Sequence, residues 1–481
     1  MRDMVLVLNF DAAASRAVTR KLRAERVFCK IVPGNIPAEE IGRQEPLGLL
    51  LAGGEESAEG LDAGALQLGL PVLALGGAAR MLAEKIGGSV GEEIFSGTLA
   101  GLRYDSDCPL FQGMESGERL LQRVRQLTLP ESARAICRAE EAAVGFACRE
   151  VPLFGLQFGI EPNDPEVSQI LCNFALNICG CTPWWDDDAF VARAAEEIGR
   201  VVGGGRAVCV MTGGLDTGVS ALLAFKALGS RLQGVFVDTG LLRAHESEDF
   251  LHFYRDTLGM NVVCVEGKER FLAALRGVSD PEEKKRRVAA TMRTVLSEQR
   301  ELLGAFDARI SGICCSDLMY GDGGAVPRWA DDVPQIEPVR ELFKDEISRA
   351  GDFLGLPSGL LSRQPFPDAG LALRILGEVT EERLETLRAA DAIFREEIMK
   401  AGLNKRLWQY FTVLSPIPGE AAGAVVCLRA VQAGGGPAYA ARLPYDLTEG
   451  AVERILRERK EVRRVVYDLT PSAHHAGIEW Q

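Results

Sequence analysis

The sequence predicts an α/β protein made of open, largely parallel sheets, with a smaller α+β region at its C-terminal end. Short apolar, β-rich runs alternate with charged segments of helical periodicity, which is the pattern of strand–helix–strand units. The 481 residues exceed what one hydrophobic core supports, so two to four domains are expected. The composition, 47% hydrophobic and 25% charged, is that of an ordinary globular protein.

The first part of the chain is predicted to form one open sheet. A charged amphipathic segment at 14–26 is a predicted helix between the first two strands. The runs predicted as strands are 5–9, 27–32, 48–52, 72–75 and 152–158. Open sheets bind ligands at the carboxyl ends of their strands, so chemistry is expected at that edge.

A change of composition at 178–188, ICGCTPWWDDD, predicts a linker that docks through its aromatic side chains. A helix at 189–202 then leads into a second sheet. The strands and helices predicted for that sheet are strands 207–211, 233–238, 262–266 and 308–316, and helices 218–226 and 279–292. The elements predicted for the α+β region at 366–481 are helices 380–401 and 447–460, and strands 424–430 and 464–469.

The stretch MTGGLDTGVS at 211–220 joins a buried strand to a helix and predicts a phosphate cradle. Its glycines let the backbone bring N–H groups close to an anion, and the helix N-terminus adds the positive end of its dipole. Thr212 and Thr217 add hydroxyl donors, and Asp216 is a candidate Mg²⁺ ligand. No Lys follows the second glycine, which favours a grip on the β,γ-pyrophosphate as leaving group, with attack at the α-phosphorus. The alternative is a plain βα turn built on Gly-Gly.

Charge and cysteine content restrict the partners. The net charge of −14 argues against nucleic acid, which requires a basic surface. No apolar run reaches the roughly 18 residues of a membrane span, and the N-terminal MRDMVLVLNF is interpreted as a strand rather than a signal peptide. The twelve cysteines lack paired-CxxC spacing, which favours reduced thiols and a cytoplasmic location. Cys179 with Cys181, and Cys314 with Cys315, are candidate metal or redox ligands, with buried thiols the commoner alternative.

These motifs resemble a known family. TGGLDT at 212–217 resembles the SGGxDS loop of ATP pyrophosphatases, and VFVDTGLLR at 235–243 is similar to VFVDHGLLR of the GMP synthetase family. Further resemblances span nearly the whole chain: DPEEKKR at 280–286, EPVRELFKDE at 337–346, RQPFPDAGLALRILGEVTEE at 363–382, LWQYFTVL at 407–414, and RVVYDLT…IEW near the end.

The resemblance implies three domains and a two-step ligation. The domains are a flavodoxin-like class-I glutamine amidotransferase domain at 1–182, a doubly wound ATP pyrophosphatase domain at 183–365, and an α+β dimerisation domain at 366–481. The C2 oxygen of xanthosine monophosphate (XMP) attacks the α-phosphorus of ATP, and ammonia then displaces AMP. ATP, Mg²⁺, a small-molecule nucleotide substrate and a homodimer through the last domain are therefore implied.

The resemblance also assigns roles to residues of this chain. It makes Asp216 and Thr217 catalytic, with Asp216 on Mg²⁺. The ATP-binding residues that it implies are Thr212, Gly213, Gly214, Asp216, Thr217, Asp238, Gly240 and Leu241. The substrate-binding residues that it implies are Lys285, Arg286, Lys344, Asp345, Asp368 and Glu479.

The same resemblance implies that the amidotransferase-like part lacks its catalytic triad. PVLALGGAARMLA at 71–83 takes the place of the nucleophile elbow and puts Gly76 at the position of the cysteine. QFGIE at 157–161 matches QFHPE, with Gly159 at the histidine and Glu161 remaining. AGGE at 52–55 falls at the oxyanion-side turn, where backbone donors are expected to persist.

The positions of the histidines lead to the same conclusion without this resemblance. The four histidines, His245, His252, His474 and His475, all lie beyond residue 244. A thiolate nucleophile needs an imidazole within hydrogen-bond reach. The sequence therefore predicts no glutaminase activity, and a first domain that serves as a scaffold, a ligand-binding module or a regulator.

The chain also departs from the family near the substrate. The segment between Tyr320 and Gln335 lacks the lysines and histidines of the family's lid, and Asp368 replaces a glycine of PFPGPG. The end, PSAHHAGIEWQ, lacks the phosphate-binding lysine; its two histidines are either substitute donors or part of a solvated tail. Three hypotheses stay open: amination of XMP with free ammonia, the same adenylating chemistry on another substrate or nucleophile, and a non-catalytic ATP-binding regulator.

Overall fold

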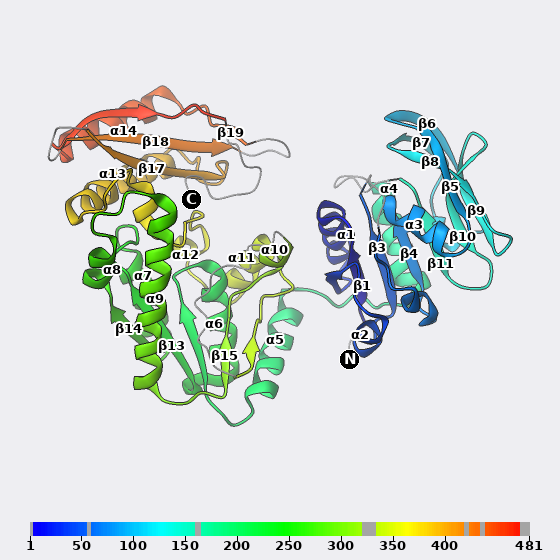
Figure 1. Ribbon diagram of the computed structural model, residues 1–481, viewed down its shortest axis with the longest axis horizontal. Coiled ribbons are helices and arrows are strands. Elements are labelled where there is room, and N and C mark those ends of the chain that lie inside the picture. Colours follow the sequence, from blue (N-terminus) through cyan, green and yellow to red (C-terminus); the bar gives the residue numbers. More distant parts are fainter. Residues whose placement is uncertain are drawn as a thin grey trace. The chain divides into compact units, whose positions relative to one another are not determined.

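The computed structural model of the chain describes residues 3–54, 59–158, 165–319, 333–417, 423–432 and 438–471. The chain divides into two compact units, Met1–Phe190 and Val191–Gln481, called unit 1 and unit 2 below (Figure 1). The predicted α/β fold class is confirmed, because unit 1 contains a mixed sheet with a parallel half and unit 2 contains a parallel sheet. The domain boundaries at 182 and 365 stay predictions. Within the described ranges no helix is long and apolar enough to cross a bilayer.

Unit 1 is organised around a nine-stranded sheet whose first half is parallel. These strands, in sheet order, are β2 (Cys29–Pro33), β1 (Val5–Asn9), β3 (Gly48–Ala52), β4 (Val72–Leu75) and β11 (Leu153–Leu156). All five agree with predicted strands, because strands covered by helices are nearly continuous apolar runs. The α-helices are α1 (Ala12–Ala24), α2 (Ala38–Arg43), α3 (Gly77–Lys85) and α4 (Pro165–Cys172), with the 3₁₀ helices η1 (Ala63–Gln67) and η2 (Pro109–Phe111) and the π-helix η3 (Asn173–Ile178).

The second half of this sheet is antiparallel, and none of its strands is predicted from the sequence. Its strands are β10 (Ala142–Cys148), β9 (Ala133–Ala139), β6 (Thr98–Tyr104) and β7 (Gly117–Leu121), and a separate pair is formed by β5 (Ser89–Phe95) and β8 (Val124–Thr128). In β5 no residue is fully buried, and in β6 only two of seven are. Strands with one wet face lack the apolar runs that identify buried ones.

The predicted docking of the 178–188 segment through its aromatic residues is confirmed within unit 1. Trp185 is buried and stacks on Phe28 with ring centroids 4.6 Å apart. The Trp184 indole Nε1 donates to the Asp3 carbonyl at 3.0 Å. The amides of both tryptophans donate to the Arg26 carbonyl at 2.9 and 2.8 Å.

Unit 2 contains a five-stranded sheet that is parallel throughout. Its strands, in sheet order, are β14 (Val262–Glu266), β13 (Leu232–Asp238), β12 (Ala207–Met211), β15 (Ala308–Ile310) and β16 (Gln335–Ile336). Chain order runs outward in both directions from β12, so the strand order reverses between β12 and β15. Doubly wound sheets bind ligands at the carboxyl end of such a reversal.

The helices of this part begin with α5 (Asp187–Val202), which passes from unit 1 into unit 2. The others are α6 (Leu215–Leu228), α7 (Glu246–Leu251), α8 (Lys268–Leu275), α9 (Pro281–Leu303), α10 (Cys315–Met319), α11 (Lys344–Phe353) and α12 (Ser358–Leu361), with the 3₁₀ helix η4 (Gly229–Arg231) and the π-helix η5 (His252–Thr257). The prediction of a strand over 308–316 is wrong after Ile310. There Asp317 Oδ2 accepts the Cys314 amide at 2.9 Å, and α10 begins.

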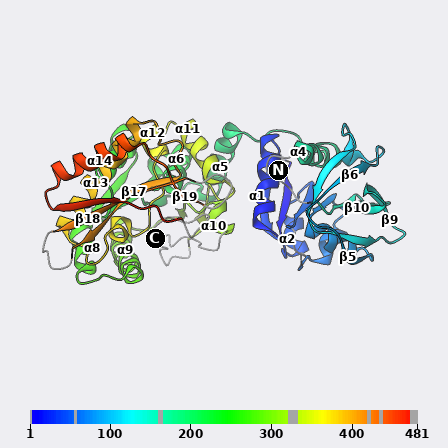
Figure 2. The ribbon, with the colours of Figure 1, turned by 90° about the horizontal axis from the view of Figure 1, so that it is seen from above.

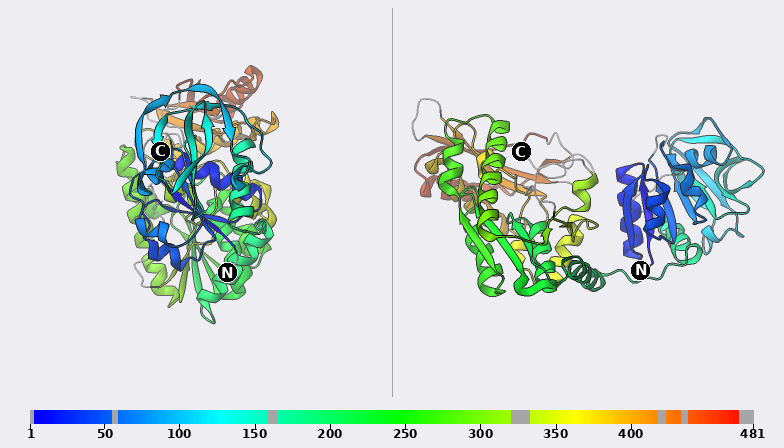
Figure 3. Two further views of the ribbon diagram at one scale, coloured as in Figure 1. Left: turned by 90° about the vertical axis from the view of Figure 1, so that its right-hand side faces the viewer. Right: turned by 60° about the horizontal axis from the view of Figure 1, so that its bottom comes forward.

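The rest of unit 2 is a four-stranded sheet with two helices. Its elements are η6 (Gly370–Arg374), α13 (Glu381–Lys400), β17 (Gln409–Pro416), β18 (Ala424–Gln432), β19 (Tyr439–Ala440), α14 (Tyr445–Glu458) and β20 (Val462–Tyr467). Strand β18 pairs antiparallel with β17 and β19 and parallel with β20. Helices α13 and α14 lie together beside this sheet (Figure 2), and the green and orange strands of unit 2 form separate sheets (Figure 3).

Candidate active site

The loop after β12 has the turn that the sequence predicts. Gly214 is the N-cap of α6, and Gly213 adopts a left-handed φ of +77° that side chains avoid. The strand is fully buried, so the loop emerges at the carboxyl edge of the sheet. This edge is next to the strand-order reversal, where an anion would meet the helix N-terminus.

The two threonines of this loop hold its shape. The Thr217 hydroxyl donates to the Gly214 carbonyl at 3.2 Å and lies 3.2 Å from the Thr212 hydroxyl. The Gly214 amide points to Thr212 Oγ1 at 3.4 Å, a long and weak contact. Thr217 is only 6% exposed. Its hydroxyl therefore serves the loop itself in this structure, and the catalytic role of Thr217 stays a prediction.

Asp216 is brought together with Lys344, two candidate residues that lie far apart in the sequence. Lys344 Nζ lies 2.5 Å from Asp216 Oδ2 and 3.7 Å from Asp317 Oδ1. Burial raises the pKa of Asp216 although Lys344 lies beside it. Burial lowers the pKa of Lys344, but Asp216 and neighbouring groups raise this pKa by more than burial lowers it, so the lysine stays charged. Asp216 Oδ1 is buried without a hydrogen-bond partner among the described residues.

A Mg²⁺ ion would fit here, because it would bind this unpaired carboxylate oxygen. Mg²⁺ is commonly held by one or two carboxylates together with substrate phosphates. Asp216, with Asp317 nearby, supplies that kind of donor. Within the described ranges no group of three or more His, Cys, Asp or Glu side chains is arranged as a self-sufficient metal site. All twelve cysteines are free thiols, so no disulfide is present.

The second candidate loop follows β13 and forms its own compact turn. Asp238 Oδ1 accepts the Gly240 amide at 2.9 Å, and the Leu241 amide donates to Thr239 Oγ1 at 3.1 Å. The Leu241 carbonyl accepts the Leu371 amide at 2.8 Å. Leu241 itself is buried, so the loop can offer a nucleoside its backbone and the Asp238 carboxylate more readily than the Leu241 side chain.

Three of the other candidate substrate residues form pairs within their own helices. Lys285 pairs with Glu282 and Arg286 with Glu283 on α9, and Asp345 lies 3.8 Å from Arg349 on α11. The structure thus does not bring these side chains to Asp216.

Asp368 is exposed. Although the residue as a whole is exposed, the surrounding chain partly removes its carboxyl group from water, and this desolvation and the nearby Asp317 raise its pKa. Glu479, His474, His475 and the lid segment 320–332 lie outside the described residues.

The turn at Gly76 in unit 1 has the backbone conformation of a nucleophile elbow, but it leaves no room for the side chain of a nucleophile. Gly76 lies between β4 and α3 with φ +59° and ψ −129°. A Cβ added there would meet the Gly53 carbonyl at 2.5 Å and the Gly54 carbonyl at 2.7 Å. A cysteine therefore does not fit unless this turn moves.

The expectation that backbone donors persist at the 52–55 turn stays a prediction, although two amides beside Gly76 are bound within the chain. The Gly77 amide donates to the Gly54 carbonyl at 2.7 Å, and the Gly53 amide donates to the Leu75 carbonyl at 3.2 Å. Both donors are therefore occupied by the chain itself. Glu55, Gly159 and Glu161 lie outside the described residues.

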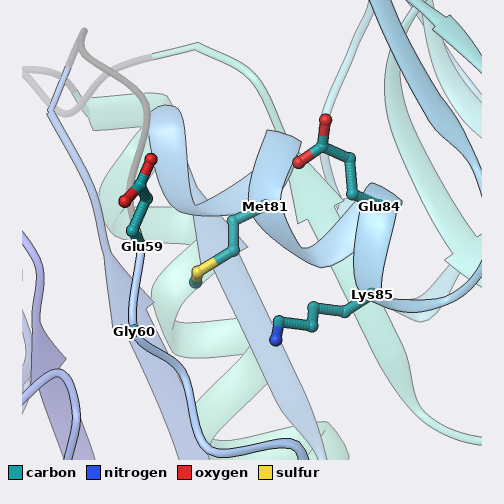
Figure 4. A pocket seen from close by; sticks show the side chains of 5 residues that line it. All are labelled: Glu59, Gly60, Met81, Glu84 and Lys85. Atoms are coloured by element: carbon teal, nitrogen blue, oxygen red, sulfur yellow. The ribbon is translucent and has the colours of Figure 1, made fainter.

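A pocket of about 280 Å³ lies beside α3 in unit 1 (Figure 4). Met81, Glu84 and Lys85 line it from α3, and Glu59 and Gly60 from the loop between β3 and η1. None of these side chains is a thiol or an imidazole, so the pocket lacks the groups of a glutaminase.

Three residues at the two loops, Glu246, Arg363 and Arg388, are not among the site residues predicted from the sequence. Arg363 Nη1 donates to the Gly213 carbonyl and pairs with Glu246, and Arg388 binds the carbonyls of Gly240 and Leu242. Arg363 begins the RQPFPDAG motif, which was the one available signal. No local pattern indicates the other two.

Comparisons with known proteins place these features in a family. Residues 396–480 match the family described as GMP synthase C terminal domain. The chain is 36% identical to the glutamine-hydrolysing GMP synthase of Caldicellulosiruptor saccharolyticus over 511 positions, covering 100% of this chain and 99% of that one. It is 35% identical to that of Clostridium acetobutylicum over 509 positions, covering 100% of both. Among solved structures, NMN synthetase from Francisella tularensis aligns with a TM-score of 0.32 at 14% identity, covering 39% of this chain and 78% of that one.

Proposed function

The chain belongs to the GMP synthase family, and on that premise we propose that it aminates a purine nucleotide with free ammonia, at the expense of ATP. The acceptor carbonyl oxygen attacks the α-phosphorus of ATP and releases pyrophosphate. Ammonia then forms the C–N bond and displaces AMP. The observation that carries this proposal is the Gly213–Gly214 turn at the sheet reversal, with Asp216 and Lys344 paired beside it.

The side chains and amides of this loop would act on charge and position. The helix N-terminus and the loop amides would stabilise the departing pyrophosphate, and Lys344 would contribute a fixed positive charge. Mg²⁺ held by Asp216 would neutralise phosphate charge. Asp238 and the Gly240–Leu241 backbone would contact the nucleoside, as the family resemblance implies. Positioning of this kind supplies a large part of such rate enhancements.

The proposal of ammonia, in place of glutamine, rests on unit 1. Gly76 offers no thiol, its surroundings leave no room for a Cβ, and all histidines lie after residue 244. The Gly77 amide, which would bind an oxyanion next to the nucleophile position, donates to the Gly54 carbonyl instead. The glutaminase half would therefore be inactive, and unit 1 would act as a scaffold or a ligand-binding module.

A second candidate is the same adenylating chemistry on a substrate other than XMP. Asp368 supports this candidate, because its carboxylate replaces a glycine of the PFPGPG motif, which lies close to the anionic nucleotide in members of the family. Repulsion between Asp368 and a substrate phosphate would disfavour XMP. The third hypothesis, an ATP-binding regulator without turnover, is kept as an outcome of the experiment. We also propose a cytoplasmic homodimer through residues 366–481.

The deciding experiment measures pyrophosphate release from ATP and Mg²⁺ with XMP, first with ammonium and then with glutamine. Release with ammonium alone supports the proposal, and release with glutamine overturns the inactive glutaminase. Release with another carbonyl acceptor, and none with XMP, selects the second candidate. Binding of ATP without release on any acceptor selects the regulator.

A further inference from the structure

The two candidate ATP loops share a local arrangement. Each contains a glycine with a left-handed φ, +77° at Gly213 and +69° at Gly240. The carbonyl of each glycine is bound by a guanidinium from much later in the chain: Arg363 Nη1 donates to Gly213, and Arg388 Nη2 to Gly240. Arg388 Nε also donates to the Leu242 carbonyl at 2.9 Å.

Arg363 is itself held in a fixed orientation. Its Nε and Nη2 each lie 3.0 Å from one oxygen of Glu246, a two-pronged pair that a lysine cannot form. Arg243 Nη1 lies 3.1 Å from Glu246 Oε1. The Arg363 and Glu246 side chains are 11% and 15% exposed, so the pair is largely shielded from water.

Arg388 is fixed by the packing of its helix. Leu384 and Leu387 of α13 share a core with Val235 of β13, while Phe394 packs in the separate core of the C-terminal sheet. Helix α13 therefore spans both cores of unit 2. One turn beyond Arg388, the Asp391 carboxylate lies 3.6 Å from Arg243 Nε, which connects the helix to the Arg363–Glu246 pair.

We propose that Arg363 and Arg388 are positioning residues that orient the ATP-binding amides. A peptide group is planar and trans, so fixing its carbonyl fixes the direction of the N–H on its other side. The peptide whose oxygen Arg363 binds carries the Gly214 N–H, and the one that Arg388 binds carries the Leu241 N–H. Both Gly214 and Leu241 are candidate ATP contacts, and in this structure their amides point to the hydroxyls of Thr212 and Thr239, which ATP would displace. A bound guanidinium also polarises the peptide and makes its N–H a stronger donor.

The test compares MgATP affinity, by calorimetry on the full chain, among the wild type, Arg363→Lys and Arg388→Lys. This inference rests on the proposed function only in taking ATP as the ligand. Lysine keeps the charge and removes the fork. Releasing the carbonyl frees the peptide to turn, and losing one well-directed amide hydrogen bond to a charged phosphate is expected to weaken MgATP binding roughly 10-fold or more. The KM for ATP should rise with it, while the KM for the acceptor stays unchanged.

Arg231→Lys is the matched control. Arg231 Nη1 donates to the Gly203 and Gly205 carbonyls at 2.6 and 3.0 Å, at the opposite end of β12. It should lose comparable thermal stability and no ATP affinity. Where Arg363→Lys does not fold, Arg388→Lys decides alone. Unchanged ATP affinity in both loop variants, or an equal loss in the control, overturns the inference and leaves the proposed function intact. A wild-type chain that binds no MgATP overturns the proposed function and the inference together.

Discussion

At the scale of single residues, the two oxygens of Asp216 have different surroundings. Oδ2 pairs with Lys344 at 2.5 Å, whereas Oδ1 is buried with no hydrogen-bond partner in the described part of the chain. We predict that Asp216→Asn, which keeps the shape and removes the charge, lowers pyrophosphate release about 100-fold or more. Thermal unfolding checks that the fold is intact. Glu298→Gln, at an exposed ion pair with Arg270, is the control. Normal turnover in Asp216→Asn would remove the loop from the mechanism.

Glu246 gives a second prediction at this scale. Burial would raise its pKa, but Arg363 and Arg243 bring it down from 4.5 to about 2. Between about pH 2 and pH 4.5, the Glu246 carboxyl group therefore binds fewer protons in the folded chain than in the unfolded chain. Its contribution to the free energy of unfolding, about 3 kcal/mol, is complete above about pH 4.5 and is lost as pH falls through about 2.

Glu246→Gln should accordingly be about 3 kcal/mol less stable than the wild type at pH 6, and the difference should shrink as pH falls toward 3. Urea unfolding across this range measures it. Glu248→Gln is the control, because Glu248 lies on the same helix and is 76% exposed. A difference that is independent of pH would contradict the assignment.

At the scale of elements, burial decided which strands could be predicted. Val72–Leu75 and Ala207–Met211 are continuous apolar runs because both faces of each strand are covered, and their predicted bounds are confirmed. Ser89–Phe95 and Thr98–Tyr104 face water and carry glutamate or arginine, so no apolar run identified them. The phosphate loop could be predicted because one contiguous stretch contains it. Lys344 and Arg363 reach it from other segments, which only the folded chain brings together.

The turn from β4 to α3 gives a prediction of its own. Gly76→Cys would place its Cβ within 2.5 Å of a backbone oxygen, so the turn has to shift, at a cost of roughly 1–3 kcal/mol. Gly69→Cys is the matched control, since Gly69 also has a left-handed φ, +72°, but has no described atom within 4 Å of an added Cβ. Chemical unfolding should show the larger loss for Gly76→Cys. Gly76→Cys combined with Gly159→His should still release no ammonia from glutamine, and measurable release would show that the turn adapts.

At the scale of the whole molecule, each unit has its own hydrophobic core. The core of unit 1 includes Val5, Leu50 and Phe154, and one core of unit 2 includes Val208, Val235 and Leu371. The candidate ATP residues belong to unit 2, whereas the residues of a glutaminase would belong to unit 1. Ligands should therefore affect the two units differently, because a ligand stabilises only the unit that binds it.

We predict two thermal transitions in scanning calorimetry of the full chain, of which MgATP raises only one. At 100 times its dissociation constant the nucleotide adds about 2.7 kcal/mol to the free energy of unfolding of unit 2, which moves that transition upward by several degrees. Glutamine should move neither transition, because the Gly53–Gly54 turn occupies the space beside Gly76. Asp216→Asn serves as the control, since a variant that binds MgATP more weakly should show a smaller shift of the unit 2 transition at the same nucleotide concentration. If glutamine raised the transition of unit 1, unit 1 would still recognise the nitrogen donor, and only the catalytic step would have been lost.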